Sequence, residues 1–282
     1  MAARNDLFQL YRYNPSMAAA CIFIVLFISV TVIHLYQMLR TRAWVFVCFV
    51  IGGFFEWIGY IGRAISSSQT PNWTVLPYVL QTLLLLIAPA LFAGSIYMML
   101  GRIILLTEGE THSLIKRRWL TKIFVCGDII SFFMQGVGGG IMASGTPSAL
   151  STGEHIVIGG LVVQLLFFGF FLITGITFHV RLCKFPTSKI LSRSLPWEKH
   201  LYVLYGASVL ILVRSLFRLI EYAQGNNGYL MSHEVYLYIF DGVLMLSTMC
   251  LLAWIHPSEV NALLKGSNSK AMRRIVSVYA LK

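Results

Sequence analysis

Several charged residues lie inside apolar stretches that are long enough to cross a bilayer. Arg214 and Arg218 stand in the run LYVLYGASVLILVRSLFRLIEY, which Glu221 nearly closes. An arginine at the centre of a transmembrane helix costs about 2.5–3.5 kcal/mol on insertion scales, so it needs a partner or a water-filled cavity. Ionisable residues inside a membrane are functional by default. We therefore expect a binding site built around these side chains.

Acidic residues from other stretches fall at the depth of these arginines. Glu56 and Arg63 are seven residues apart and share a helical face, and Asp241 enters the last apolar stretch at a similar level. Buried charges in lipid pair with one another or line a wet cavity. The pattern predicts an internal network beneath an opening to the outside, with three residues of each sign: Arg63, Arg214 and Arg218 facing Glu56, Glu221 and Asp241.

Uncharged polar residues extend this predicted site. Gln81 and Gln164 lie at a similar height, and Asp128, Ser131 and Gln135 follow one stripe of a helix, with Asp128 deepest. We expect that stripe to continue a polar path inward. The predicted substrate-binding set is Glu56, Arg63, Gln81, Asp128, Gln135, Gln164, Arg214, Arg218, Glu221 and Asp241. An alternative is that the charges only lock the helices together, because buried ion pairs can specify packing without binding anything.

The elements that position these residues are predicted from composition and hydropathy. Of the 282 residues, 57% are hydrophobic and 12% are charged, and the mean hydropathy is +0.74. These values indicate an all-α, polytopic membrane bundle. Pro89 is expected to kink the third span near its centre, and the glycine-rich run 136–140 to allow close helix contact. Seven spans are predicted, at roughly 17–38, 43–65, 77–100, 120–144, 155–181, 200–222 and 235–256.

The distribution of basic residues predicts how the bundle is oriented. Most of the 22 lysines and arginines lie in segments 39–42, 101–122 and 181–199 and in the tail. The positive-inside rule therefore places the N-terminus outside and the C-terminus in the cytosol. Asn72 begins an Asn-Trp-Thr glycosylation sequon in a loop predicted to face outward, which agrees. The predicted organisation is an extracellular segment 1–16, a transmembrane domain 17–256 and a basic cytosolic tail 257–282.

Several function classes lack their sequence signals. The net charge of +11 is explained by cytoplasmic loops, and no basic soluble module indicates a nucleic-acid partner. The seven histidines include no His-x-x-x-His pair, so we expect no metal site. There is no Gly-x-Ser-x-Gly motif and no Walker motif. We expect no catalytic residue and no cofactor; the expected partners are membrane lipids or amphipathic small molecules, and nothing predicts the oligomeric state.

Five sequence segments carry a resemblance to a known family. They are EWIGYIGR at 56–63, Gln81 followed by LIAP at 86–89, GDIISFFMQG at 127–136, Gly160 and Leu161 followed by Gln164, and the stretch that runs from Arg214 to Asp241. Together they resemble the fungal RTA-like family, also called lipid-translocating exporters. The resemblance covers nearly the whole chain, from YNPS at 13–16 to His256 and Pro257. It implies a seven-span protein associated with tolerance to toxic amphipaths, including sphingoid long-chain bases and sterol-like amines, and in one member with porphyrin traffic. It carries over no agreed binding residues.

Three functions are compatible with these observations. The leading hypothesis is movement or export of amphipathic, cationic lipids, with Glu56, Asp241 and Glu221 holding the ammonium group. Because no ATP-binding motif is present, such movement would be downhill or coupled to protons. A second hypothesis is a seven-span receptor or sensor of extracellular amphipaths that regulates other transporters, and a third is an intramembrane lipid hydrolase. The plasma membrane is the expected location, with the vacuolar or another internal membrane as the alternative.

Overall fold

A computed structural model describes residues 11, 13–142, 146–192, 196–225 and 228–264, and within them the chain is a bundle of helices without strands. Seven helices are long and apolar enough to cross a membrane, which confirms the predicted fold class. The spans are α1 (Met17–Thr41), η2 and α2 (Trp44–Phe46, Val47–Ser68), α3 (Val75–Leu106), α4 (Arg117–Met142), α5 (Pro147–Lys184), α7 (Trp197–Ala223), and the seventh span α8, η4 and α9 (Glu234–Leu237, Tyr238–Val243, Leu244–Trp254). Shorter helices are η3 (Glu110–His112), α6 (Ser188–Ser192) and α10 (Ser258–Leu264).

Capping residues set where two of the spans begin. The Ser16 side chain accepts a hydrogen bond from the backbone N–H of Ala19, and Thr146 does the same for Ala149. These hydroxyls satisfy backbone donors that have no partner within the first helical turn. Because Pro147 follows Thr146 at the first helical position, α5 starts eight residues before its predicted boundary at 155.

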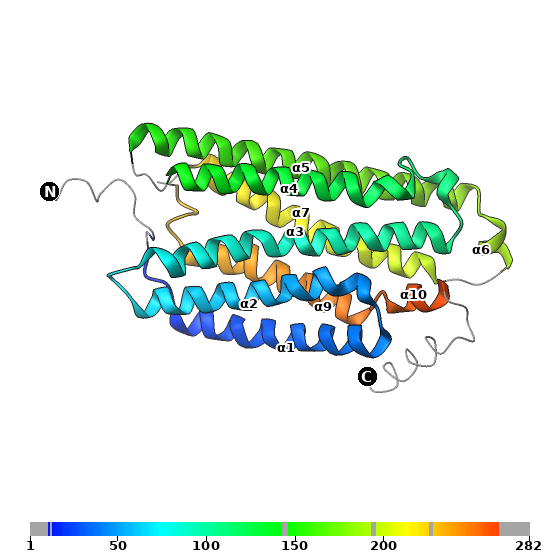
Figure 1. The fold of residues 1–282 in the computed structure, drawn as a ribbon, viewed down its shortest axis with the longest axis horizontal. Helices are drawn as coiled ribbons and strands as arrows, with labels where there is room; N and C mark the ends of the chain where they lie inside the picture. Colours follow the sequence, from blue (N-terminus) through cyan, green and yellow to red (C-terminus); the bar gives the residue numbers. More distant parts are fainter. Residues whose placement is uncertain (1–10, 12, 143–145, 193–195, 226–227, 265–282) are drawn as a thin grey trace.

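The helix α3 runs through the middle of the bundle (Figure 1) and packs against α2, α4 and α7. Helices α1, α2 and α9 lie on one side of α3, and α4 and α5 lie on the other. Two ends of the bundle can be distinguished. The Ser16 end contains Ser16 and loop 69–74, and the α10 end contains α6 and α10.

Small residues bring α2 and α3 close together. A Cβ atom added to Gly62 would lie 2.9 Å from the backbone oxygen of Pro77, and one added to Gly52 would lie 2.7 Å from the Phe92 ring. Small residues at a helix–helix interface let the backbones of membrane helices approach, which larger side chains at the same positions would prevent. The face of α2 that carries Glu56 and Arg63 is therefore pressed against its neighbours rather than exposed to lipid.

The boundaries of the predicted domains are described only in part. The predicted extracellular segment is described at Tyr11 and at residues 13–16, and the predicted tail at 257–264. The first residues of that tail form α10, which packs against α3 at the end of the bundle. The rest of both segments lies outside the described residues.

Candidate functional site

Arg214 of α7 lies at the centre of the bundle and connects three helices. Its side chain is 4% exposed, and its Nε donates a hydrogen bond to the carboxylate of Asp241 in η4. Its NH2 group donates to the backbone oxygen of Leu85 in α3, at 2.7 Å. The planar guanidinium suits this position because it offers several donors in a fixed geometry. Two members of the predicted network, Arg214 and Asp241, are therefore in direct contact.

The carbonyl that Arg214 binds is one that the sequence leaves without a helical partner. Proline has no backbone N–H, so Pro89 cannot donate to the carbonyl four residues before it, which is that of Leu85. Broken backbone pairs in membrane helices must be satisfied by neighbouring groups. Arg214 does so here, which allows α3 to continue through Pro89 while the arginine itself gains an acceptor.

Asp241 lies in an irregular part of the seventh span. Residues Tyr238–Val243 form a π-helical segment, η4, between α8 and α9. Such segments are rare and frequently occur at functional sites. A Cβ atom on the following residue, Gly242, would lie 2.6 Å from the Tyr60 hydroxyl, so glycine permits close contact between η4 and α2. The site thus lies where α3 is interrupted by proline and the seventh span by a π-helix.

Glu56 of α2 faces this pair and has no hydrogen-bonding partner. Its residue exposure is 1%, and neither carboxylate oxygen has a partner among the described residues. Asp241 and Arg214 are its charged neighbours, close enough to act on it electrostatically. Arg218 of α7 also experiences the charge of Asp241. Glu56, Asp241, Arg214 and Arg218 therefore form one electrostatically connected group, which we call the central cluster.

Glu221 extends the central cluster along α7 through Arg218. The Arg218 NH1 group donates to the Glu221 carboxylate at 2.6 Å, so two further members of the predicted network are in contact. The Arg218 guanidinium also lies over the ring of Tyr222, 5.1 Å from its centroid. The i,i+3 spacing makes this pair local to one helix. It therefore adds charge to the site without connecting helices.

Arg63 belongs to a separate group at the Ser16 end. Its carboxylate partner is Glu234, which was not among the acids predicted for the network. Its NH2 group donates to Glu234 of α8 at 2.7 Å and to the Tyr13 hydroxyl at 2.9 Å, and its Nε donates to Tyr238. Glu234 also accepts from the backbone N–H of Ser16. We call Tyr13, Ser16, Arg63, Glu234 and Tyr238 the end clasp.

The predicted glutamines do not converge on the central cluster. Gln81 of α3 accepts a hydrogen bond from the Tyr11 hydroxyl at 2.8 Å, next to the end clasp. Burial raises the pKa of Tyr11, which keeps that hydroxyl a donor. The side-chain nitrogen of Gln135 donates to Ser131 and, at 3.2 Å, to Gln164, so these residues join α4 to α5.

Asp128 belongs to this α4–α5 seam rather than to the central cluster. It is buried on the same stripe of α4 as Ser131 and Gln135 and lies near the Tyr97 hydroxyl of α3, and neither of its carboxylate oxygens has a hydrogen-bond partner among the described residues. Ser131 donates to the backbone oxygen of Gly160 at 2.7 Å. The expected stripe is present, and two of its members, Ser131 and Gln135, join α4 to α5.

Comparison with known proteins identifies the chain. The model of the family described as RTA1 like protein matches residues 49–263. The chain belongs to the RTA1-like family. It is 39% identical to Protoporphyrin uptake protein 1 of Saccharomyces cerevisiae, over 87% of this chain and 91% of that protein. It is 36% identical to Protein RTM1 of the same species, over 84% and 88%, and 28% identical to Sphingoid long-chain base transporter RSB1, over 87% and 71%. No solved structure matches the chain.

The RTA1-like match contains the whole central cluster, from Glu56 to Asp241, and the α4–α5 seam. Together with the seven apolar helices, membership makes the chain an integral, multi-pass membrane protein. Tyr13 and Ser16 of the end clasp precede the matched residues.

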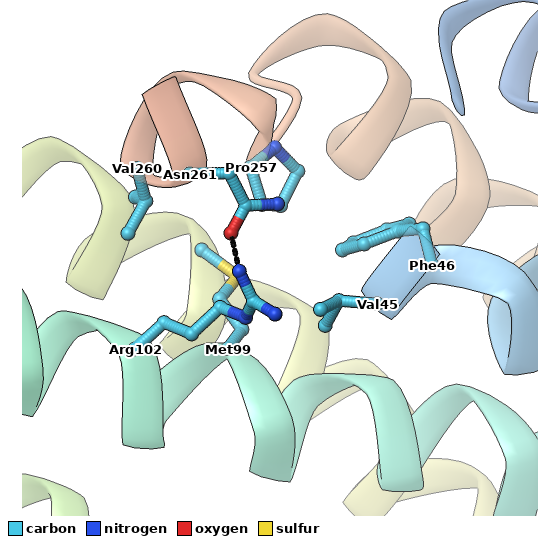
Figure 2. Close-up of a pocket in the computed structure, with 7 residues that line it drawn as sticks. All are labelled: Val45, Phe46, Met99, Arg102, Pro257, Val260 and Asn261. Atoms are coloured by element: carbon cyan, nitrogen blue, oxygen red, sulfur yellow. Dashed lines mark hydrogen bonds between the residues drawn. The ribbon is translucent and has the colours of Figure 1, made fainter. Parts of the chain in front are cut away.

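Three side chains of the central cluster are almost completely buried by the described residues. Arg214, Asp241 and Glu56 are each at most 5% exposed, so the conformation at these residues is closed. A pocket lies near the α10 end (Figure 2), where Arg102 donates to Asn261. It is lined by Val45, Phe46, Met99, Arg102, Pro257, Val260 and Asn261, none of which was predicted as a site residue.

Sequence reasoning missed Glu234, Tyr13 and the hydrogen bond from Arg214 to the Leu85 carbonyl. Glu234 carried a usable signal, because it starts the seventh span at the depth of Arg63. The Leu85 carbonyl could have been found as well, since any proline inside a helix frees the carbonyl four residues earlier. Asn72 is exposed in the α2–α3 loop, as a glycosylated residue must be. Its glycosylation stays a prediction.

Proposed function

We propose that this protein moves amphipathic lipids with a cationic head group across the membrane, with sphingoid long-chain bases as the substrate class. One observation carries the proposal. Each of the three intramembrane arginines is paired with its own carboxylate, and at the central cluster Glu56 is a further carboxylate without an arginine of its own. A buried acid in excess over its partners provides a place for a cation.

The proposed mechanism places the ammonium group at Glu56 and Asp241. Arg214 balances Asp241 while the site is empty, and the alkyl chain lies between the apolar helices. An irregular α3 and an irregular seventh span adjoin this position, and interrupted helices form substrate sites near the midplane in many transporters. Opening the closed site requires the charged side chains to separate, and no Walker motif supplies ATP energy for this step.

The names of two relatives bear on the substrate class and point to different substrates. The relative named Sphingoid long-chain base transporter RSB1 handles a cationic amphipath by its name, and Protoporphyrin uptake protein 1 handles a ring with carboxylate groups. The second is the more similar in sequence, so a porphyrin is the competing substrate. The carboxylate groups of a porphyrin would bind to the arginines once the protein carboxylates that now pair with them had moved away. The excess acid at Glu56 favours the base.

The decisive experiment is transport in liposomes that contain the purified protein and a labelled phytosphingosine. We expect the labelled base to cross the liposome membrane and reach an acceptor on the other side, and we expect this flux to be lost in the Glu56→Gln variant. A charged hydrogen bond contributes about 1.5–3 kcal/mol, so the loss should be roughly tenfold to hundredfold. Glu110→Gln, which changes an exposed carboxylate in η3, is the matched control and should keep the wild-type rate.

The same preparation separates the alternatives. Binding of the base without flux would favour a sensor, and a chemically altered lipid would favour a hydrolase. Flux of protoporphyrin but not of the base would show that the substrate is a porphyrin and would favour a substrate site formed by the arginines. Wild-type flux in Glu56→Gln would remove the proposed site. In cells, we expect tolerance to added phytosphingosine and residence in the plasma membrane, which a fluorescent fusion would test.

A further inference from the structure

Glu56 differs in its surroundings from Asp241 and Glu221, the acids that lie nearest to it in the central cluster and along α7. Asp241 and Glu221 each accept a hydrogen bond from an arginine, whereas neither oxygen of Glu56 has a partner among the described residues. The residue is 1% exposed. A buried carboxylate that keeps its charge needs a counter-ion or hydrogen bonds to replace the water it has lost.

The groups around Glu56 leave it without a counter-ion of its own. Arg214 is its positive neighbour, but that guanidinium binds Asp241 and the Leu85 carbonyl. Asp241 is negative, and Tyr60, one turn further along α2, is a neutral phenol in electrostatic contact with Glu56. The other side chains described against this part of α2 are uncharged: Phe23, Phe27 and Thr31 of α1, Leu85 and Phe92 of α3, Tyr238 of η4 and Met249 of α9.

Charge counting then constrains the empty site. Within the central cluster and Glu221, Arg214 and Arg218 balance Asp241 and Glu221. If Glu56 were ionised as well, the group would carry one uncompensated negative charge in a dry, low-dielectric interior. A proton on Glu56 makes the total zero. Once a cationic head group is present, the total is zero only if Glu56 is ionised.

We propose that Glu56 holds a proton while the site is closed and empty, and that it releases this proton when a cationic head group binds. The inference rests on the proposed function, because it adds the exchange of one proton for one cation at that site. The reaction is the dissociation of the Glu56 carboxylic acid to a carboxylate and a proton. The proton passes to the water that enters as the site opens, and the ammonium group becomes the counter-ion of Glu56. Transport of the base is thereby coupled to an opposite movement of protons.

The protonation of Glu56 can be tested without any substrate. An infrared spectrum of the reconstituted wild-type protein, minus that of Glu56→Gln, isolates the C=O stretching band of a protonated Glu56. We expect a protonated-acid band in this difference at neutral pH. Asp128, in α4, is a second buried acid without a partner among the described residues, and the Asp128→Asn variant identifies its contribution to the protonated-acid band. Identical spectra in the protonated-acid region for wild type and Glu56→Gln would overturn the proposal, whatever the protein transports.

The exchange is tested by adding phytosphingosine to the same samples. We expect the Glu56 band to disappear and one proton to be released per base bound, as read by an indicator in weak buffer. Because binding releases one proton, the apparent affinity for phytosphingosine should increase about tenfold for each unit by which the pH is raised, as long as Glu56 is protonated in the empty site. Glu110→Gln should keep that slope. Binding with no proton release, or with no pH slope, would overturn the exchange while leaving the transport proposal intact. A base that is neither bound nor moved would overturn both, and the spectra would still report the protonation of Glu56.

Discussion

At the scale of single residues, Arg214 is the most constrained side chain in the site. It binds a carboxylate of η4 and a backbone carbonyl of α3 at the same time, while belonging to α7. A lysine would carry the same charge but presents it as a compact ammonium group, without the planar fork of the guanidinium. The identity of this residue, and not only its charge, should therefore affect stability.

We expect Arg214→Lys to destabilise the protein more than Arg218→Lys does. Losing one of the two bonds leaves a buried acceptor unsatisfied, which costs about 1–3 kcal/mol. Arg218 pairs only within its own helix and is partly exposed, so its replacement should cost less. Thermal unfolding in detergent measures both variants. Equal losses would show that Arg214 acts through charge alone.

The ion pairs show how far a sequence can predict contacts inside a membrane. Depth and helical spacing place Arg214 and Asp241 at a similar level and Arg218 and Glu221 on one face of α7, and the structure pairs them in this way. Glu56 and Arg63 share a face of α2, yet they lie in separate groups, with Arg63 bound to Glu234. Depth restricts the possible partners, but how far a helix is rotated about its axis chooses among them. That rotation depends on packing that one sequence does not encode locally.

At the scale of elements, the proline in α3 and the arginine in α7 act as one unit. Replacing Pro89 with alanine would restore a backbone N–H that can donate to the Leu85 carbonyl. Arg214 would then no longer be the carbonyl's sole donor. The polar contact between α3 and α7 therefore depends on the interruption in α3.

A double-mutant cycle tests this dependence. We expect Arg214→Gln to cost clearly less in a Pro89→Ala background than in the wild type, with a coupling of about 0.5–3 kcal/mol for residues that share a partner. The measurement is the free energy of unfolding of the four proteins in detergent. Additive effects, within about 0.5 kcal/mol, would contradict the link between Pro89 and Arg214.

The contact between α4 and α5 gives a second element-scale prediction. A Cβ atom on Gly138 would lie 2.6 Å from the backbone oxygen of Gly153, whereas one on Gly139 would meet nothing within 4 Å. We expect Gly138→Ala to force the helices apart and cost about 1–3 kcal/mol, and Gly139→Ala to be neutral or slightly stabilising. Thermal unfolding compares the two. Similar losses at both positions would contradict this packing.

The same glycines mark a limit of sequence reasoning about elements. The run 136–140 is correctly predicted to permit close contact, but only Gly138 within it makes that contact. Gly136, Gly139 and Gly140 meet open space, because they lie on other faces of the helix. Composition locates a contact surface to within a few residues. The neighbouring helix, which the sequence does not name, decides which residue lies in it.

At the scale of the whole molecule, contacts close the bundle at both ends. The end clasp joins Arg63 to Glu234 and Tyr13 at the Ser16 end. At the α10 end, Arg102 and Lys199 bind Asn261 and Glu259 of α10. The sequence predicts the seven spans because hydropathy is local. It does not predict these closures, since they join residues up to 218 positions apart, as between Ser16 and Glu234.

The predicted orientation makes the two ends chemically distinguishable in intact cells. Asn72 lies exposed in the loop at the Ser16 end, and Thr111 lies exposed in η3 at the opposite end. In a variant without the five native cysteines, Asn72→Cys should react with a membrane-impermeant maleimide added outside intact cells. Thr111→Cys should react only after the membrane is permeabilised, because the basic segment around it is expected to be cytosolic. The reverse labelling pattern would invert the bundle and would place the end clasp on the cytosolic side.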